Sequence, residues 1–260
     1  VQDSNAQLRR ETTVGDVTVR ASSVDVRTVG AGGGSIAHVP ELTGALRVGP
    51  ESAGAEPGPA AYNKGGDLPT VTDANVVLGY LPSEVRLGGD MEIRKDLAEK
   101  AIKPVADALG ISVKRAAAGI IDIVNENMYG ALRLVSVEQG FDPRDFALIG
   151  FGGAGPLHGG SLARLLGAKT VIVPPSPGVL SAMGLLVSQL RADYARTCYQ
   201  APPDFDQPLM NSAYAELEAE AAAWFDREGV PEAARHITRK ASLRYKHQGF
   251  ELDIDWPDGP

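Results

Sequence analysis

The longest regular hydrophobic pattern in the chain covers residues 112–138. Apolar side chains recur there in steps of three and four, which places them on one face of a helix and predicts that this face is buried. Gly140 is expected to end the helix, which should be the central one of its domain. The apolar positions are Ala117, Ile120, Ile121, Val124, Met128, Ala131, Leu132 and Val135.

Downstream of this helix the pattern changes to an apolar run, a glycine-rich turn and an amphipathic run. Residues 146–151 predict a buried strand, residues 156–166 a helix and residues 169–173 a second strand. Gly167 fits the stop between that helix and the second strand. Two strands joined through a helix form a βαβ unit, so this alternation predicts a mixed α/β architecture.

The remaining segments carry shorter patterns. Residues 14–29 alternate as short strands, and residues 36–48 predict a hairpin with its turn at Thr43-Gly44. Residues 49–68 are rich in Gly, Pro and Ala and predict a loop. Further helices are expected at residues 96–109, 178–190 and 205–228, and further strands at 193–200 and 241–256.

The turn after strand 146–151 reads Gly152-Gly153-Ala154-Gly155, with Pro156 opening the next helix. Such a junction points backbone N–H groups and the positive end of a helix into solvent, and small residues let a nucleotide lie flat against the backbone. The same turn also occurs without a ligand, so the motif alone leaves both interpretations open. It is not a Walker A loop, because no Lys-Ser/Thr pair follows.

Composition narrows the classes of partner and compartment. The net charge of −8 is spread along 260 residues without a basic stripe, which argues against nucleic acid as a partner. No apolar stretch approaches the length of a membrane span, and the first residues lack a signal-peptide pattern. The single cysteine, Cys198, is typical of a reducing cytoplasm and is expected to be a small core residue.

Six segments, spread along nearly the whole chain and in the same order as in the family, resemble the hydantoinase A/5-oxoprolinase family. That family includes N-methylhydantoinase and the carboxylase subunits that act on acetone and acetophenone. Because the chain starts at Val1 without Met and ends in Trp256-Pro-Asp-Gly-Pro260, we expect a C-terminal piece of a hydantoinase A domain. The matching segments are residues 24–37, 48–60, 70–75, 151–158, 177–182 and 243–252.

The resemblance implies an α/β fold of the actin and sugar-kinase type, with RNase H-like halves, a mixed sheet and packed helices that close over ATP. Residues 152–155 would then lie on the adenosine side of the nucleotide site. The Asp-x-Gly-Gly-Thr phosphate loops of the family are absent from this sequence. We therefore expect one wall of an ATP cleft, divided into segments 1–90 (β-rich, with loops), 91–200 (helical, with the βαβ unit) and 201–260 (a helix plus strands).

The resemblance also implies a reaction. With ATP and Mg²⁺, the complete protein would phosphorylate and open a lactam or hydantoin ring, together with a hydantoinase B-type subunit or domain. The alternative is a non-catalytic assembly or binding module of a related ketone carboxylase complex. The sequence does not say whether the substrate is a hydantoin, 5-oxoproline or a ketone. The catalytic residues are expected to lie outside this chain, so the isolated chain is expected to be inactive.

Several residues are candidates for contact with these ligands. The loop Gly32-Gly33-Gly34-Ser35 presents backbone N–H groups to a phosphate or substrate, or is simply a tight loop. Asp73, with Asn75 nearby, either caps a helix or contacts substrate or metal from a second layer. His158 either contacts ribose or relays a proton, or it packs on its own helix and caps a carbonyl.

Overall fold

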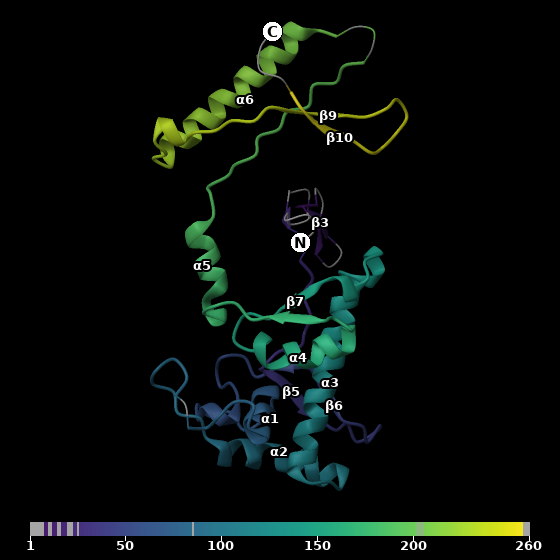
Figure 1. Cartoon of the computed structure of the whole chain (residues 1–260), viewed down its shortest axis with the longest axis vertical. Helices are drawn as coiled ribbons and strands as arrows, with labels where there is room; N and C mark the ends of the chain where they lie inside the picture. The colour runs from purple at the N-terminus through teal and green to yellow at the C-terminus, as the bar shows by residue number, and fades with distance from the viewer. Residues whose placement is uncertain are drawn as a thin grey trace. The chain divides into compact units, whose positions relative to one another are not determined.

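The structure is a computed structural model that describes residues 8–9, 12–14, 17–19, 23–24, 26–84, 86–201, 203 and 205–256. The chain divides into two compact units, Val1–Leu186 and Val187–Pro260. Figure 1 shows the helices and strands of both. The first unit begins with four short strands, β1 (Leu8–Arg9), β2 (Thr12–Val14), β3 (Val17–Val19) and β4 (Ser23–Val24).

Three helices form the core of the first unit: α1 (Val71–Leu78), α2 (Lys95–Leu109) and α3 (Val113–Leu134). Their facing sides are apolar, so packing them together removes a continuous hydrophobic surface from water. Ser112 starts α3, and its hydroxyl accepts a hydrogen bond from the Arg115 N–H at 3.3 Å. The fully buried apolar residues of α3 are Ala116, Ala117, Ile120 and Val124.

The expectation for the end of α3 was wrong. The α-helix ends at Leu134, and a 3-10 turn, η2 (Val137–Gln139), precedes Gly140. Gly140 ends that turn with a φ of 83° instead of ending α3. The last apolar positions of the predicted stripe are only partly covered, and Val135 is 37% exposed, because they line a cavity.

The predicted hairpin is confirmed. Strand β5 (Ser35–His38) pairs antiparallel with β6 (Arg47–Ser52). The turn closes where the Thr43 and Gly44 N–H groups donate to the Pro40 carbonyl. Strand β6 extends into the segment expected to be loop, which then continues to the 3-10 turn η1 (Ala60–Tyr62).

The predicted βαβ unit is also confirmed, but its first strand is not buried as expected, since Ile149 is 50% exposed. Strand β7 (Ala147–Ile149) follows the 3-10 turn η3 (Pro143–Asp145) and pairs in parallel with β8 (Thr170–Ile172). Helix α4 (Gly155–Leu166) connects the strands and ends at Gly167, whose φ is 72°. A 3-10 turn, η4 (Pro177–Val179), and helix α5 (Leu180–Val187) come next.

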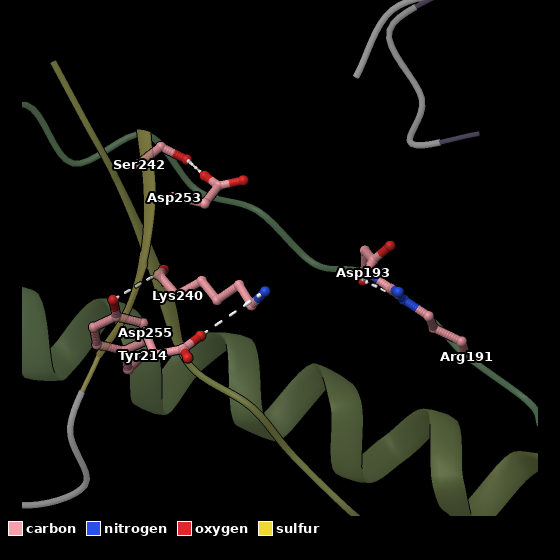
Figure 2. A network of polar contacts seen from close by, with 7 residues as sticks. All are labelled: Arg191, Asp193, Tyr214, Lys240, Ser242, Asp253 and Asp255. Carbon is pink, nitrogen blue, oxygen red and sulfur yellow. Dashed lines mark hydrogen bonds and ion pairs between the residues drawn. The ribbon is translucent and has the colours of Figure 1, made fainter. Parts of the chain in front are cut away.

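The second unit consists of helix α6 (Gln207–Arg227), the 3-10 turn η5 (Glu232–Ala234) and an antiparallel hairpin of β9 (Lys240–Leu243) and β10 (Leu252–Asp255). None of its described residues is fully buried. Its contacts are mainly polar: Figure 2 shows the Ser242–Asp253 hydrogen bond, the Lys240–Asp255 ion pair and the Tyr214 hydroxyl on the Lys240 carbonyl.

Two expectations for this unit were wrong. Residues 193–200 contain no strand, because a strand needs a neighbour for its backbone hydrogen bonds and this segment has none among the described residues. Cys198 is exposed and is not part of a core.

Candidate functional site

The glycine junction lies at the carboxyl end of β7. Gly152 has a φ of 80°, a conformation that favours glycine, and its N–H donates to the Pro177 carbonyl at 2.8 Å. A Cβ at Gly150 would lie 3.2 Å from the Gly155 carbonyl oxygen, so the two backbones approach closely. Gly153 is exposed and has no atom within 4 Å of an added Cβ, so its side faces open space.

The start of α4 has no side-chain cap. Ala154 is the N-cap residue and offers no hydrogen-bond acceptor on its side chain, and Pro156 in the first turn carries no N–H. The Leu157 N–H donates to the Ala154 carbonyl at 3.0 Å, which leaves the Gly155 N–H of the first turn to be offered to a ligand. The helix dipole favours an anion or a polar ligand there. This geometry leaves the junction available for a ligand.

A cavity of about 750 Å³ adjoins the junction. Its volume lies within the range of about 300–1,000 Å³ that is usual for small-molecule pockets. Its lining includes Ala31 and Gly32 from one glycine-rich segment and Gly150, Ala154 and Gly155 from the other. The structure therefore brings the ends of two sequence-predicted loops to one cavity.

The rest of the cavity wall is mostly apolar. It includes Met128, Ala131 and Leu132 from the second half of α3, and among the described residues Arg27 is the one charged residue in its lining. An apolar wall suits an aromatic ring or a hydrocarbon surface and does not neutralise several negative charges.

The loop Gly32–Ser35 is tightly packed. The Ser35 hydroxyl accepts a hydrogen bond from the Gly32 N–H at 3.0 Å, and the Gly33 carbonyl accepts one from the Thr72 N–H at 2.9 Å. Added Cβ atoms at Gly33 and Gly34 would lie 2.7 Å from the hydroxyl oxygens of Thr72 and Ser52. Close packing accounts for these two glycines, and a phosphate contact from the loop stays a prediction.

Asp73 does not cap α1 from the N-cap position. Thr70 is the N-cap residue, and Asp73 occupies the third position of a capping box. The fully buried Asp73 carboxylate accepts hydrogen bonds from the Thr70 hydroxyl at 2.7 Å, the Thr70 N–H at 2.9 Å and the Ala61 N–H at 2.8 Å. These bonds tie η1 to the start of α1, so the visible role of this carboxylate is structural.

Asn75 and His158 are both buried, at 2% and 1% exposure, and each retains one buried side-chain atom without a partner among the described residues. Asn75 donates to the Val71 carbonyl at 3.1 Å, and its Oδ1 accepts nothing. His158 Nδ1 lies 2.8 Å from Oδ1 of Asn125, and its Nε2 is unpaired. Burial lowers the pKa of His158 below its ordinary value of 6.5.

Sequence reasoning missed Asn125 as the partner of His158. The two residues are 33 positions apart, on α3 and α4, and no local motif links them. His158 does not cap a carbonyl of its own helix, as one interpretation had it, and neither His158 nor Asp73 is in the cavity lining.

Within the described ranges, no three His, Cys, Asp or Glu side chains cluster in a way that could hold a metal ion. Helices long and apolar enough to cross a bilayer are likewise missing from the part of the chain that the structure describes.

Comparison with known proteins identifies the class. The family model for hydantoinase/oxoprolinase matches residues 1–194. The chain is 51% identical over 175 residues to caprolactamase subunit alpha of Pseudomonas jessenii, which covers 67% of the chain and 25% of that protein. It is 47% identical over 242 residues to the acetophenone carboxylase gamma subunit of Aromatoleum aromaticum, covering 91% of the chain and 31% of that protein.

A solved structure agrees with these matches. The nucleotide-free structure of acetone carboxylase, which carries out ATP-dependent acetone carboxylation, superimposes with a TM-score of 0.85 and 28% identity, covering 97% of this chain and 37% of that one. The chain therefore belongs to the hydantoinase/oxoprolinase family. Its expected fold class, the α/β fold of actin-like ATPases, is confirmed. The chain spans a third or less of the length of the caprolactamase and acetophenone carboxylase subunits.

Proposed function

We propose that this chain forms the adenosine-side wall of the nucleotide site in an ATP-dependent enzyme that opens a cyclic amide. The observation that carries the proposal is the cavity at the start of α4, where an uncapped helix end and glycine backbone meet an apolar wall. Family membership supports the reaction class, because the relatives include a caprolactamase and ATP-dependent carboxylation.

The residues present fit one part of ATP and not the rest. An adenine ring can lie on the apolar wall and against Gly155, while the start of α4 offers the Gly155 N–H to a polar atom of the nucleoside. The triphosphate needs several cations or a phosphate loop, and Arg27 is the only cationic side chain that the described residues bring to the cavity lining. The described residues do not form a Mg²⁺ site either, so its ligands would come from elsewhere in the complete protein.

In this proposal the nucleotide supplies the phosphoryl group that activates the amide oxygen. The residues of this chain bind and orient it. The glycine backbone permits close approach, and the apolar wall from α3 excludes water from one side of the nucleotide. A hydantoinase B-type subunit or domain would complete the substrate site, in a cytoplasmic assembly.

The test is a pair of identical substitutions in the complete protein. Gly153 and Gly130 are both exposed, and an added Cβ meets no atom within 4 Å at either position. Gly153→Val should raise the Kd for ATP at least about tenfold, roughly 1.4 kcal/mol, without lowering the melting temperature. Gly130→Val, on α3 and away from the glycine junction, should leave both unchanged. If Gly153→Val folds and binds ATP like the parent, the junction is not in the site.

The isolated chain should not hydrolyse ATP, because the phosphate loops are absent. A phosphate-release assay on the 260 residues measures this directly. Turnover near about 1 s⁻¹, an ordinary enzyme rate, would contradict the proposal.

One observation favours the second candidate, an assembly module. Helix α5 carries Met183, Leu185 and Leu186 with exposures of 50%, 80% and 85%. Apolar side chains exposed this far are typical of a surface that another protein segment covers. Leu185→Glu should then abolish association with the hydantoinase B-type subunit in size-exclusion chromatography, while ATP binding stays as in the parent.

A further inference from the structure

One buried side-chain hydrogen bond joins α3 to α4. Nδ1 of His158 lies 2.8 Å from Oδ1 of Asn125, and the two side chains belong to residues that are 1% and 4% exposed. An amide oxygen can only accept, so the imidazole carries its proton on Nδ1 and donates it to Asn125. The bond therefore fixes one tautomer of the ring.

The surroundings keep His158 in that form. Its Nε2 has no hydrogen-bond partner in the described part of the chain, and burial lowers the pKa of the ring. A second proton on Nε2 would place an unpaired charge in an apolar interior, which is strongly unfavourable. His158 is thus a neutral donor to Asn125, with Nε2 enclosed by protein atoms.

The position of this bond matters because of what lies beside it. His158 is three residues beyond Gly155, the first residue of α4. The preceding turn is held at Gly152, whose N–H donates to the Pro177 carbonyl at 2.8 Å. Apolar contacts on α4, such as those of Leu162, have no fixed direction, whereas a hydrogen bond weakens steeply when its geometry changes.

We propose that Asn125 and His158 are positioning residues that fix the start of α4, and with it the backbone of Gly152–Gly155, in the orientation that binds the nucleotide. The nucleotide part of this inference rests on the proposed function. Neither side chain is in the cavity lining, so both act through the glycine junction.

The first experiment compares two neighbouring substitutions on α3 in the complete protein. Asn125→Leu keeps the approximate side-chain volume and removes the acceptor, while Val124→Ala removes apolar packing from a residue with 0% exposure. Asn125→Leu should raise the Kd for ATP by about tenfold, as is common when a supporting hydrogen bond of a site is lost. Val124→Ala should lower the melting temperature at least as much and keep the Kd within about twofold of the parent. Equal effects of both on the Kd would overturn the proposal.

The second experiment uses conservative replacements of the ring. The side-chain nitrogen of Asn corresponds in position to Nδ1 of His, and that of Gln corresponds to Nε2. His158→Asn should retain ATP affinity better than His158→Gln, by about fivefold or more if the donor at Nδ1 is what matters. Long-range ¹H–¹⁵N NMR of the parent should show the Nδ1–H tautomer for the signal that disappears in His158→Asn. The other tautomer, or equal affinities of the two variants, would contradict the proposal.

A third measurement does not depend on ATP and separates the two proposals. Amide hydrogen exchange should become faster at Gly152 and Leu157 in Asn125→Leu but not in Val124→Ala, because only the first variant releases the junction. Faster exchange without a change in ATP affinity would show that the Asn125–His158 bond holds the glycine junction in place and would disprove its role in nucleotide binding. Unchanged exchange would disprove the link itself, whatever the fate of the nucleotide assignment.

Discussion

Helices α3 and α6 have nearly the same length, 22 and 21 residues, but are held in different ways. Six residues of α3 are buried, and none of α6 is. Helix α6 is held by surface contacts such as the Glu218–Arg239 ion pair, at 2.5 and 3.0 Å, and a stacked pair of rings, Tyr214 and Trp256. Helix propensity alone gives an isolated helix only marginal stability in water. The apolar area that each helix buries must therefore decide how much free energy stabilises it. We therefore expect the first unit to be the more stable of the two.

The largest expected effect comes from one type of truncation made in both helices. Ile121→Ala on α3, at a position that is 7% exposed, should cost about 2–5 kcal/mol of unfolding free energy. Leu217→Ala on the half-buried side of α6 should cost less than about 1.5 kcal/mol. Urea unfolding can separate the units, because both tryptophans, Trp224 and Trp256, lie in the second. Equal losses for both variants would show that burial does not distinguish the helices.

The next effect concerns the buried carboxylate at the start of α1. Asp73→Asn replaces one acceptor oxygen by an amide group that faces N–H donors, so we expect a loss of about 1–3 kcal/mol. The control is Asp107→Asn on α2, whose carboxylate pairs with Lys103 at the surface and should matter little. Circular dichroism during denaturant unfolding measures both, and a similar small change in the two variants would refute a structural role for Asp73.

A smaller effect should appear as a function of pH. Well above pH 6.5 His158 is neutral in the folded and the unfolded chain, so its contribution to stability is complete. As the pH falls below 6.5, the unfolded chain binds a proton and the folded one does not, because burial lowers the folded pKa. Stability should therefore decrease by up to about 1.4 kcal/mol per pH unit from this residue. His158→Asn should remove that slope, and His236→Asn, exposed in the second unit, serves as the control.

The smallest expected effect is in the second unit. The Arg239 guanidinium, through its hydrogen bonds, lowers the pKa of Glu218 below its ordinary value of 4.5. The pair is partly exposed, so Arg239→Lys should cost less than about 1 kcal/mol. That cost should be present above pH 4.5 and disappear as the pH falls through the folded pKa of Glu218, since protonation ends the pairing. Denaturant unfolding followed by tryptophan fluorescence at pH 7 and pH 3 checks this. A loss of unfolding free energy above about 2 kcal/mol would show that the contacts of the second unit stabilise it as strongly as burial stabilises the first.

Local signals in the sequence predicted most of the fold. Gly167 ends α4 and Gly110 ends α2 because both take positive φ values, 72° and 65°, that glycine adopts without strain. The capping box at α1 was also readable, since Thr70-Val-Thr-Asp73 has the required spacing. The expectation had placed the cap at Asp73, three residues too late.

The features that could not be predicted from the sequence are those that depend on contacts between residues far apart in the chain. Nothing near His158 indicates that Asn125 lies opposite, because the pairing arises from the packing of two helices. The stripe on α3 correctly predicted Ile120 and Val124 as buried, but periodicity cannot tell a core wall from a cavity wall such as that at Leu132. Whether residues 152–155 and 32–35 bind a nucleotide stays a prediction for the same reason.

The carboxylate of Asp73 has a practical consequence for protein engineering. Its bonds to Ala61 and Thr70 hold both ends of the intervening segment, and Gly66 packs so closely on the Gly58 carbonyl that no side chain fits there. The tip, residues 63–65, is exposed, and an added Cβ at Gly65 meets no atom within 4 Å. Doubling the length of a flexible loop costs only about 0.6 kcal/mol. An affinity tag or a fluorophore-binding peptide inserted after Lys64 should therefore leave α1 and the cavity in place, which makes the tip a labelling site.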